Sequence, residues 1–235
     1  MNTITVICMQ ASYILITETT MAYDLEEQEQ LATLKAWWKQ YGNLVTWLVI
    51  AVLAAYASWS GWKYYQREQA SKAALLYEEI VKAVEGKDQN RLARATSDIR
   101  ERYARTPYAS MGALLAAKSA FDVNDLKSAK AYLQWVVDQS SGEEYQAIAR
   151  LRLAGLLLDE KAYDEGLKLL AAPFPDQFAG LVADRRGDLL FAQNKIEDAR
   201  AAYQLALEKT DVKSPARQLI QLKLDAIGGS TTQAG

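Results

Sequence analysis

The sequence of 235 residues carries 27 basic and 29 acidic side chains, which gives a formal net charge of −2. This balance excludes the clustered basic excess of a nucleic-acid-binding surface. The chain has no histidine and one cysteine, Cys8, which excludes an internal disulfide, a thiolate metal site and a histidine-assisted nucleophile. We therefore expect no metal, no cofactor and no nucleic-acid partner.

Residues 1–20 differ in character from the rest of the chain. They are apolar and rich in Thr, and they contain no Lys or Arg, whereas a signal peptide begins with a positively charged region. Met21 then opens a polar, acidic stretch. We expect translation to start at Met21 and residues 1–20 to be an artefact of start-site assignment. The alternative is a natural, disordered extension.

Residues 21–41 are predicted to form an amphipathic N-terminal segment. Asp24 can cap a helix there, and the acidic residues that follow suit the positive end of the helix dipole. Trp37, Trp38 and Tyr41 would lie at the depth of lipid headgroups. The alternative is an ordinary solvated lead-in to the next segment.

Residues 42–62 are predicted to form a transmembrane helix. The 23 residues from Gln40 to Trp62 contain no charge. As a helix they would be about 35 Å long, enough to cross a hydrocarbon core of about 30 Å. Trp and Tyr residues crowd both ends, as in the aromatic belts of membrane spans.

The charges that flank this span do not settle its orientation. Lys35 and Lys39 precede it, and Lys63, Arg67 and Lys72 follow it. This small excess favours a cytoplasmic C-terminal side. The rule is weak here because large domains cross membranes largely regardless of charge.

From residue 63 to residue 229 the pattern is that of a helical repeat domain, followed by a disordered tail over 230–235. Loop signals recur at Thr106–Pro107, Ser140–Gly142, Pro173–Pro175 and Ser214–Pro215, which is close to the tetratricopeptide period of about 34 residues. We predict an all-α fold. It comprises one transmembrane helix and a tetratricopeptide-like α-solenoid of about four helical hairpins, with a capping helix over 215–227. An irregular helical bundle is the alternative.

Small residues mark the predicted crossings within each hairpin. Ala95, Ala129, Gly166 and Ala199 are 34, 37 and 33 residues apart. The fourth hairpin fits the repeat well and the second moderately, whereas the third is degenerate and the first poor. The further positions that carry this pattern are Ile99 and Pro107; Ala117, Leu133 and Val136; Ala154 and Leu170; and Gly187, Tyr203 and Ala206.

The sequence contains no catalytic motif that we recognise: no G-x-S-x-G, no P-loop and no G-x-G-x-x-G. We therefore expect a protein that is not an enzyme. Two groups of arginines could hold a phosphate or an acidic partner, but we interpret them as solvated helix faces. They are Arg185–Arg186 and the run Arg94, Arg100, Arg102 and Arg105.

Two segments on either side of the span carry a family resemblance. The stretch YDLEEQEQLATLKAWWKQYGN (Tyr23–Asn43) precedes the span, and WKYYQREQASKAALLYEEI (Trp62–Ile80) follows it. With the single span between them, they resemble the ancillary subunits of the bacterial SecYEG translocon. The resemblance covers essentially everything from Met21 onward.

The resemblance implies a single-pass protein of the bacterial inner membrane, with its repeat domain in the periplasm. This orientation follows the family and not the charge count. The implied role is a protein-binding accessory subunit beside the SecYEG translocon. Its implied partners are membrane lipid, translocating or unfolded polypeptides, and a membrane-anchored periplasmic chaperone of the prolyl-isomerase type. The alternative is a cell-envelope regulatory or scaffolding adaptor that binds a signalling partner.

A protein-binding groove is predicted along the first helices of the second, third and fourth hairpins. In tetratricopeptide arrays these helices line the concave face. An apolar lining would suit unfolded or hydrophobic segments, although the same residues could instead pack against neighbouring helices. The lining positions are apolar except for Asp184, and they comprise Met111, Leu114, Phe121, Ile148, Leu151, Leu158, Leu181 and Phe191.

Overall fold

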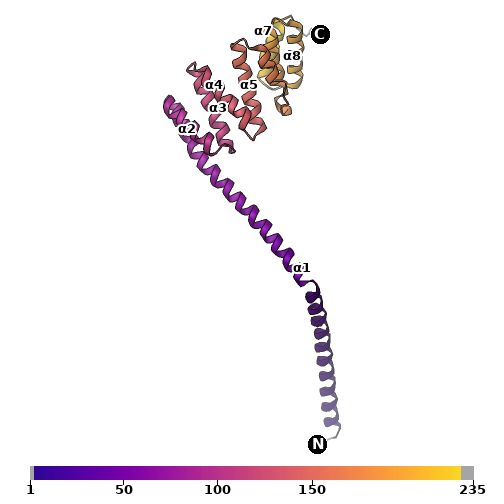
Figure 1. Cartoon of the computed structure of the whole chain (residues 1–235). Coiled ribbons are helices and arrows are strands. Elements are labelled where there is room, and N and C mark those ends of the chain that lie inside the picture. The colour runs from indigo at the N-terminus through magenta and orange to yellow at the C-terminus, as the bar shows by residue number, and fades with distance from the viewer. Residues whose placement is uncertain (1–2, 229–235) are drawn as a thin grey trace, which may run out of the picture. The chain divides into compact units, whose positions relative to one another are not determined.

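The computed structural model describes residues 3–228, and the side chains of residues 29–228. Every regular element within that range is a helix, as predicted. The chain divides into two compact units, one that ends at Tyr65 and one that begins at Gln66. Figure 1 shows the short helices of the second unit stacked in chain order. The expectations for residues 230–235 and for the side chains of residues 1–20 lie outside the described part of the chain.

The first helix, α1, runs from Thr3 to Glu85. It passes without a break through the segment boundaries that we expected after residues 41 and 62. All four prolines of the chain lie after residue 106, so no ring removes a backbone donor within α1. The backbone of residues 3–20 belongs to this helix, and the predicted translation start at Met21 stays a prediction.

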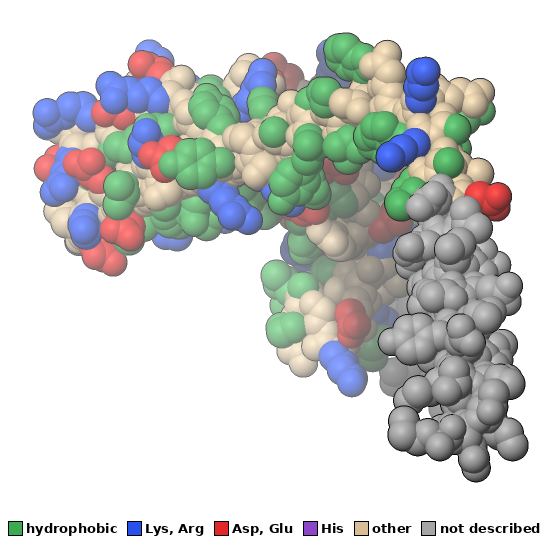
Figure 2. Space-filling view, turned by 90° about the horizontal axis from the view of Figure 1, so that it is seen from below, with side chains coloured by type: hydrophobic (Ala, Val, Ile, Leu, Met, Phe, Trp, Pro, Cys, Tyr) green, Lys and Arg blue, Asp and Glu red, His purple; other side chains and the backbone are tan. Residues whose placement is uncertain are grey.

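One stretch of α1, within residues 29–85, is long and apolar enough to cross a membrane. Large apolar side chains such as Leu44, Trp47 and Leu53 are exposed there, and Figure 2 shows hydrophobic side chains gathered over this stretch. Such a surface is costly in water and stable in lipid. A helix also meets the other demand of the bilayer, because its backbone groups bond within the segment.

The second unit contains the four predicted hairpins and the predicted cap. Each hairpin pairs two antiparallel helices through a tight turn, and successive hairpins pack side by side. The pairs are the end of α1 from Gln66 with α2 (Gln89–Arg102), α3 (Pro107–Asp122) with α4 (Leu126–Gln139), α5 (Glu143–Asp159) with α6 (Tyr163–Leu169), and α7 (Ala179–Ala192) with α8 (Ile196–Lys209); α9 (Ala216–Ala226) follows.

The small residues of the repeat lie where helices approach closely. Ala95, Ala129, Gly166 and Ala199 are all buried. A methyl group added at Gly166 would lie 2.9 Å from a methyl carbon of Leu189 in the next hairpin. The recurrence of small residues therefore has a steric cause, since a larger side chain would push neighbouring helices apart.

The turn within each hairpin has the same backbone conformation. One residue per turn, Lys87, Asn124, Lys161 or Asn194, adopts a left-handed φ between 55° and 62°. The next N–H then bonds the carbonyl five residues back, as from Asp125 to Ala120 at 2.8 Å. This is the Schellman ending of a helix, and it satisfies carbonyls that the helix leaves free.

The third hairpin is the irregular one, as its sequence suggested. Its second helix, α6, has only 7 residues. Pro173 and Pro175 follow it, and a 3-10 turn over Asp176–Phe178 leads into α7. Because proline disfavours helix at the preceding residue and lacks a donor itself, this segment cannot continue α6.

The last helix, α9, covers the end of the fourth hairpin. Ile220 and Leu224 are fully buried in one cluster with Tyr203 and Ala206 of α8. Arg217 donates hydrogen bonds to the carbonyls of Leu207 and Thr210, at the end of α8. The apolar face of the last hairpin is thus closed by α9, which is what a terminal cap must do.

Candidate protein-binding groove

The predicted groove residues fall into two groups in the structure. Phe121, Leu181 and Phe191 are exposed, at 49%, 46% and 49% of their surface. They lie on α3 and α7, the first helices of the second and fourth hairpins. Exposed aromatic and aliphatic side chains on these helices are consistent with a binding lining, and their role in binding stays a prediction.

The other predicted residues contribute to packing. Leu114 is only 7% exposed and lies in the core of the second and third hairpins, so it is not available to a partner. Ile148 packs against that same core, and Leu151 and Leu158 pack against a second cluster that contains Leu189. Helical spacing alone places these residues on one face, but that face is partly filled by the neighbouring hairpin.

Met111 and Asp184 are half-buried. Asp184 accepts hydrogen bonds from the ammonium group of Lys223 on α9, at 2.8 and 3.0 Å. The one polar position of the predicted lining therefore holds the capping helix in place.

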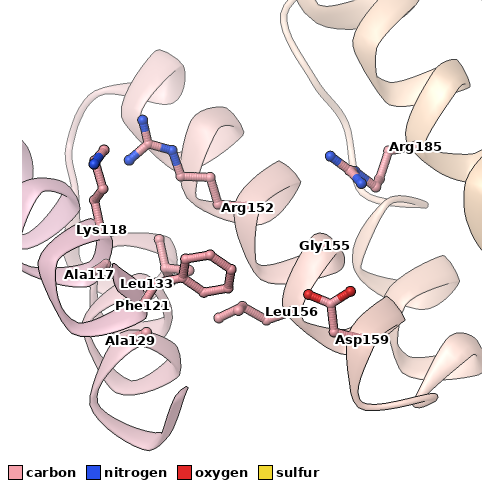
Figure 3. Close-up of a pocket in the computed structure, with 10 residues that line it drawn as sticks. All are labelled: Ala117, Lys118, Phe121, Ala129, Leu133, Arg152, Gly155, Leu156, Asp159 and Arg185. Atoms are coloured by element: carbon pink, nitrogen blue, oxygen red, sulfur yellow. The ribbon is translucent and has the colours of Figure 1, made fainter. Parts of the chain in front are cut away.

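A pocket of about 420 Å³ opens at the point where the second, third and fourth hairpins meet (Figure 3). Of the predicted groove residues it includes only Phe121. Its floor is made by side chains that are buried, and its rim carries charged groups from three different helices. The lining residues are Ala117, Lys118, Phe121, Ala129, Leu133, Arg152, Gly155, Leu156, Asp159 and Arg185; we call this site the cationic pocket.

Among the lining residues, Lys118, Arg152 and Arg185 are cationic and Asp159 is anionic. Lys118 and Arg185 also pair with carboxylates beside the pocket, those of Asp122 and Asp188. Figure 3 shows Lys118 and Arg152 on one side of the pocket and Arg185 on the other. The whole chain has a net charge of −2, so this concentration of cations is a local property of the pocket.

Each cation is oriented by a neighbouring acceptor. Lys118 bonds the carboxylate of Asp122 at 2.7 Å, one turn along α3. Arg152 donates from Nη1 to the carbonyl of Leu114 at 3.3 Å. The carboxylate of Asp122 therefore compensates the charge of Lys118 in part, whereas the neutral carbonyl of Leu114 orients Arg152 and leaves its charge uncompensated.

Arg185 is held by a more buried network that extends to α9. Its Nη1 donates to Oδ2 of Asp188 at 3.3 Å, while Oδ1 of Asp188 accepts from the Tyr203 hydroxyl at 2.9 Å. Lys223 also pairs with Asp188 at 2.8 Å. Burial, together with the carboxylate of Asp188, raises the pKa of the Tyr203 hydroxyl, so that Tyr203 remains a donor.

Not all of the arginines expected on solvated helix faces lie there. Arg102 pairs with Asp98 at 3.6 Å on an exposed face, as expected for a solvated helix surface. Arg185 instead points into the pocket, and Arg100 covers the ring of Trp135 at 4.9 Å from its centre. Arg152 and Arg185 come together only through the stacking of two hairpins, so no local sequence pattern predicts that they share one pocket.

Comparisons with known proteins agree with this architecture. A family described as "Tetratricopeptide repeat-like domain" matches residues 35–229. The chain is 34% identical over 211 residues to a protein of Neisseria gonorrhoeae (strain ATCC 700825 / FA 1090) named "Ancillary SecYEG translocon subunit", covering 88% of this chain and 100% of that protein.

Proteins of the same name match from other bacteria. The protein of Escherichia coli (strain K12) is 30% identical over 203 residues, which cover 85% of this chain and 95% of the relative. The one from Haemophilus influenzae (strain ATCC 51907 / DSM 11121 / KW20 / Rd) is 27% identical over 187 residues, covering 77% and 91%. With its apolar helix and its four-hairpin domain, this chain belongs to the family of ancillary SecYEG translocon subunits.

Proposed function

We propose that this chain is a membrane-anchored, protein-binding accessory subunit of the SecYEG translocon. The observation that carries the proposal is the joining of a membrane-length apolar helix to a hairpin array in one chain of this family. Helical repeat arrays serve as extended binding surfaces. The relatives are named as translocon subunits, and this supports a binding role in place of a catalytic one.

The proposal includes the placement of the repeat domain. It would lie in the periplasm, with α1 spanning the bacterial inner membrane among its lipids. There the domain would receive translocating or unfolded polypeptides and pass them to a membrane-anchored chaperone of the prolyl-isomerase type. The exposed Phe121, Leu181 and Phe191 support contact with apolar segments of such chains.

Co-purification from a mild detergent tests the role. The tagged full chain should bring down SecYEG together with a periplasmic chaperone. A matched control replaces residues 42–62 with an unrelated apolar span, so that membrane insertion is kept while the native span is lost. Recovery of a sensor kinase or a cell-wall enzyme without SecYEG would favour the envelope-adaptor alternative.

Cysteine labelling tests the orientation. Ser141 lies exposed in the loop between α4 and α5, and Cys8 is the one native cysteine. In a Cys8→Ser background, Ser141→Cys should react with a membrane-impermeant thiol reagent once the outer membrane is permeabilised. Reaction only after lysis of the inner membrane would show that the domain is cytoplasmic.

A further inference from the structure

We propose that the cationic pocket binds an acidic segment of a partner protein, in which a carboxylate side chain lies beside a large apolar one. The proposal rests on the proposed function, because it assigns a partner chemistry to the same protein-binding domain. It differs from the groove predicted from sequence, whose lining was apolar except for Asp184. The sequence pattern did not predict that the charged groups of Lys118, Arg152 and Arg185 would meet at one site.

The apolar half of the pocket can seat one large side chain. Ala117, Ala129, Leu133 and Leu156 form a floor of buried side chains, and the half-exposed ring of Phe121 forms a wall. The volume of about 420 Å³ lies within the range of built binding sites, about 300–1,000 Å³. An aliphatic or aromatic side chain placed there would cover Phe121 and remove its exposed surface from water.

The charged half of the pocket selects for a carboxylate. Arg152 and Arg185 each present a planar guanidinium with five N–H donors, a geometry suited to a carboxylate. Gly155 lies between them, and the Arg185 guanidinium carbon would be only 3.7 Å from a methyl group at that position. That distance is an ordinary van der Waals contact, so the guanidinium of Arg185 packs beside Gly155 at the edge of the pocket.

The anchoring of the two arginines favours binding over collapse of the pocket. Arg185 is oriented by Asp188, which also accepts from Tyr203, and Arg152 donates one hydrogen bond of 3.3 Å to the carbonyl of Leu114. Groups that are held in place lose little conformational freedom when a ligand arrives. Asp159 lies on the same rim, so a basic residue of the partner would be accepted only at that edge.

Peptide binding to the purified full chain in detergent tests the proposal. Three fluorescein-labelled peptides share one sequence that contains a Phe, and they differ only in carrying Glu, Gln or Lys at two positions next to it. Fluorescence anisotropy should show binding of the Glu peptide, with the Gln peptide about tenfold weaker, as expected for the loss of charge-assisted hydrogen bonds. Raising the salt to about 0.5 M should weaken the Glu peptide most.

Variants of the pocket sharpen the test. Arg152→Gln and Arg185→Gln should each weaken the Glu peptide about tenfold and leave the Gln peptide nearly unchanged. Arg152→Lys should fall between the two, because it keeps the charge and loses the planar fork. Arg102→Gln, which removes an exposed charge on α2, is the matched control and should bind like the unaltered chain. Circular dichroism checks that each variant is folded.

Three results would overturn the proposal: no binding of the Glu peptide up to about 1 mM, the range of very weak interactions; equal binding of all three peptides; or unchanged binding in both glutamine variants. The assay contains no translocon. Its failure therefore leaves the proposed function standing, whereas failure of SecYEG to co-purify with the unaltered chain would count against the proposed function itself.

Discussion

Gly187 lies on α7 where the ring of Tyr203 on α8 crosses it. A methyl group there would lie 2.6 Å from Cδ1 and 2.9 Å from Cζ of that ring, and closer still to Cε1. Tyr203 cannot easily move, because it is buried and its hydroxyl bonds Asp188. We expect Gly187→Ala to lower the free energy of unfolding by about 1–3 kcal/mol, measured by thermal unfolding of the chain in mild detergent.

Gly155 provides the matched comparison within a helix of the same domain. A methyl group at that position would lie 3.7 Å from the guanidinium carbon of Arg185, which is an ordinary contact distance. Gly155→Ala should therefore raise stability by about 0.5–1 kcal/mol through helix propensity alone. Equal effects of the two substitutions would show that the close contact at Gly187 is not what limits that position.

Asp184 should make stability depend on pH. Burial raises its pKa above the ordinary carboxyl value, although the hydrogen bond from Lys223 acts in the opposite direction. The folded chain therefore holds this proton more tightly than the unfolded chain. This contribution to stability is complete below the ordinary pKa of about 3.9 and is lost as pH rises through the higher, folded pKa.

The comparison with Asp184→Asn checks this sign. The difference in Tm, unaltered chain minus variant, should become smaller as pH rises from about 3.5 to about 7. The amide cannot titrate, so the variant removes only the contribution of this carboxyl. A difference that grows with pH would mean that the pairing with Lys223 outweighs the burial of Asp184.

The positions of some residues could be predicted from the sequence, whereas those of others could not. Ala129, Ala199 and Gly187 were predictable, because the repeat demands small residues wherever two consecutive helices cross. Leu114 was assigned to the groove and is buried instead, since a helix face cannot reveal how closely the next hairpin packs on it. Arg152 and Arg185 belong to different hairpins, and their joint presence at one pocket follows from stacking, which no local pattern encodes.

At the level of helices, two second helices begin with a side-chain cap and two do not. Asp88 accepts from the N–H of Arg91, and Asp125 accepts from the N–H of Ser128 at 3.1 Å. Lys195 occupies the corresponding position before α8 with nearly the same backbone angles as Asp125, but it provides no such bond. The hydrogen bond from Ser128 lowers the pKa of Asp125.

Removing the cap before α4 and adding one before α8 should therefore change stability in opposite directions. Asp125→Ala should lower the free energy of unfolding, whereas Lys195→Asp should raise it by about 0.5–1 kcal/mol. Thermal unfolding at neutral pH measures both. If Lys195→Asp is neutral, repulsion from Glu197 and Asp198 in the first turn of α8 offsets the new cap.

Helix boundaries were largely predictable from turn chemistry. Asn124 and Asn194 tolerate the left-handed conformation that the turns require, and the predicted cap over 215–227 is observed as α9 at Ala216–Ala226. The length of α1 was not predicted as one helix, because the change from apolar to charged residues at 62 and 63 suggests a boundary. The backbone hydrogen bonds of an α-helix continue unbroken across such a change from apolar to charged side chains.

For the domain as a whole, the array should fold without lipid. Its hairpins bury their apolar faces on one another, and a fragment that begins at Gln66 contains every one of the four core clusters of the described residues. We expect this fragment to be soluble, helical and cooperatively unfolding by circular dichroism. Aggregation that only detergent reverses would show that residues before Gln66 are needed for folding.

Removal of the cap should weaken the same fragment. Ending it at Thr210 deletes α9, which uncovers Tyr203 and Ala206 and leaves Asp184 and Asp188 without the cation of Lys223. We expect a lower Tm than for a fragment that ends at Gly228, since an unpaired buried carboxylate and exposed apolar surface both destabilise. An unchanged Tm would mean that α9 is not a stabilising cap.

The short α6 has a consequence for how the domain comes apart. The cluster that joins the third hairpin to the fourth contains 3 buried residues, against 11 in the cluster that the second hairpin forms with α5. In a linear array each junction has its own opening energy, so the weakest junction sets where cooperativity fails. Amide hydrogen exchange should then divide the domain at residues 170–178, with α7, α8 and α9 opening together. Arg185 belongs to α7, so each such opening would also remove one side of the cationic pocket. A ligand that binds both Arg152 and Arg185 would oppose this opening. It would therefore slow amide exchange in α9, although α9 does not line the pocket.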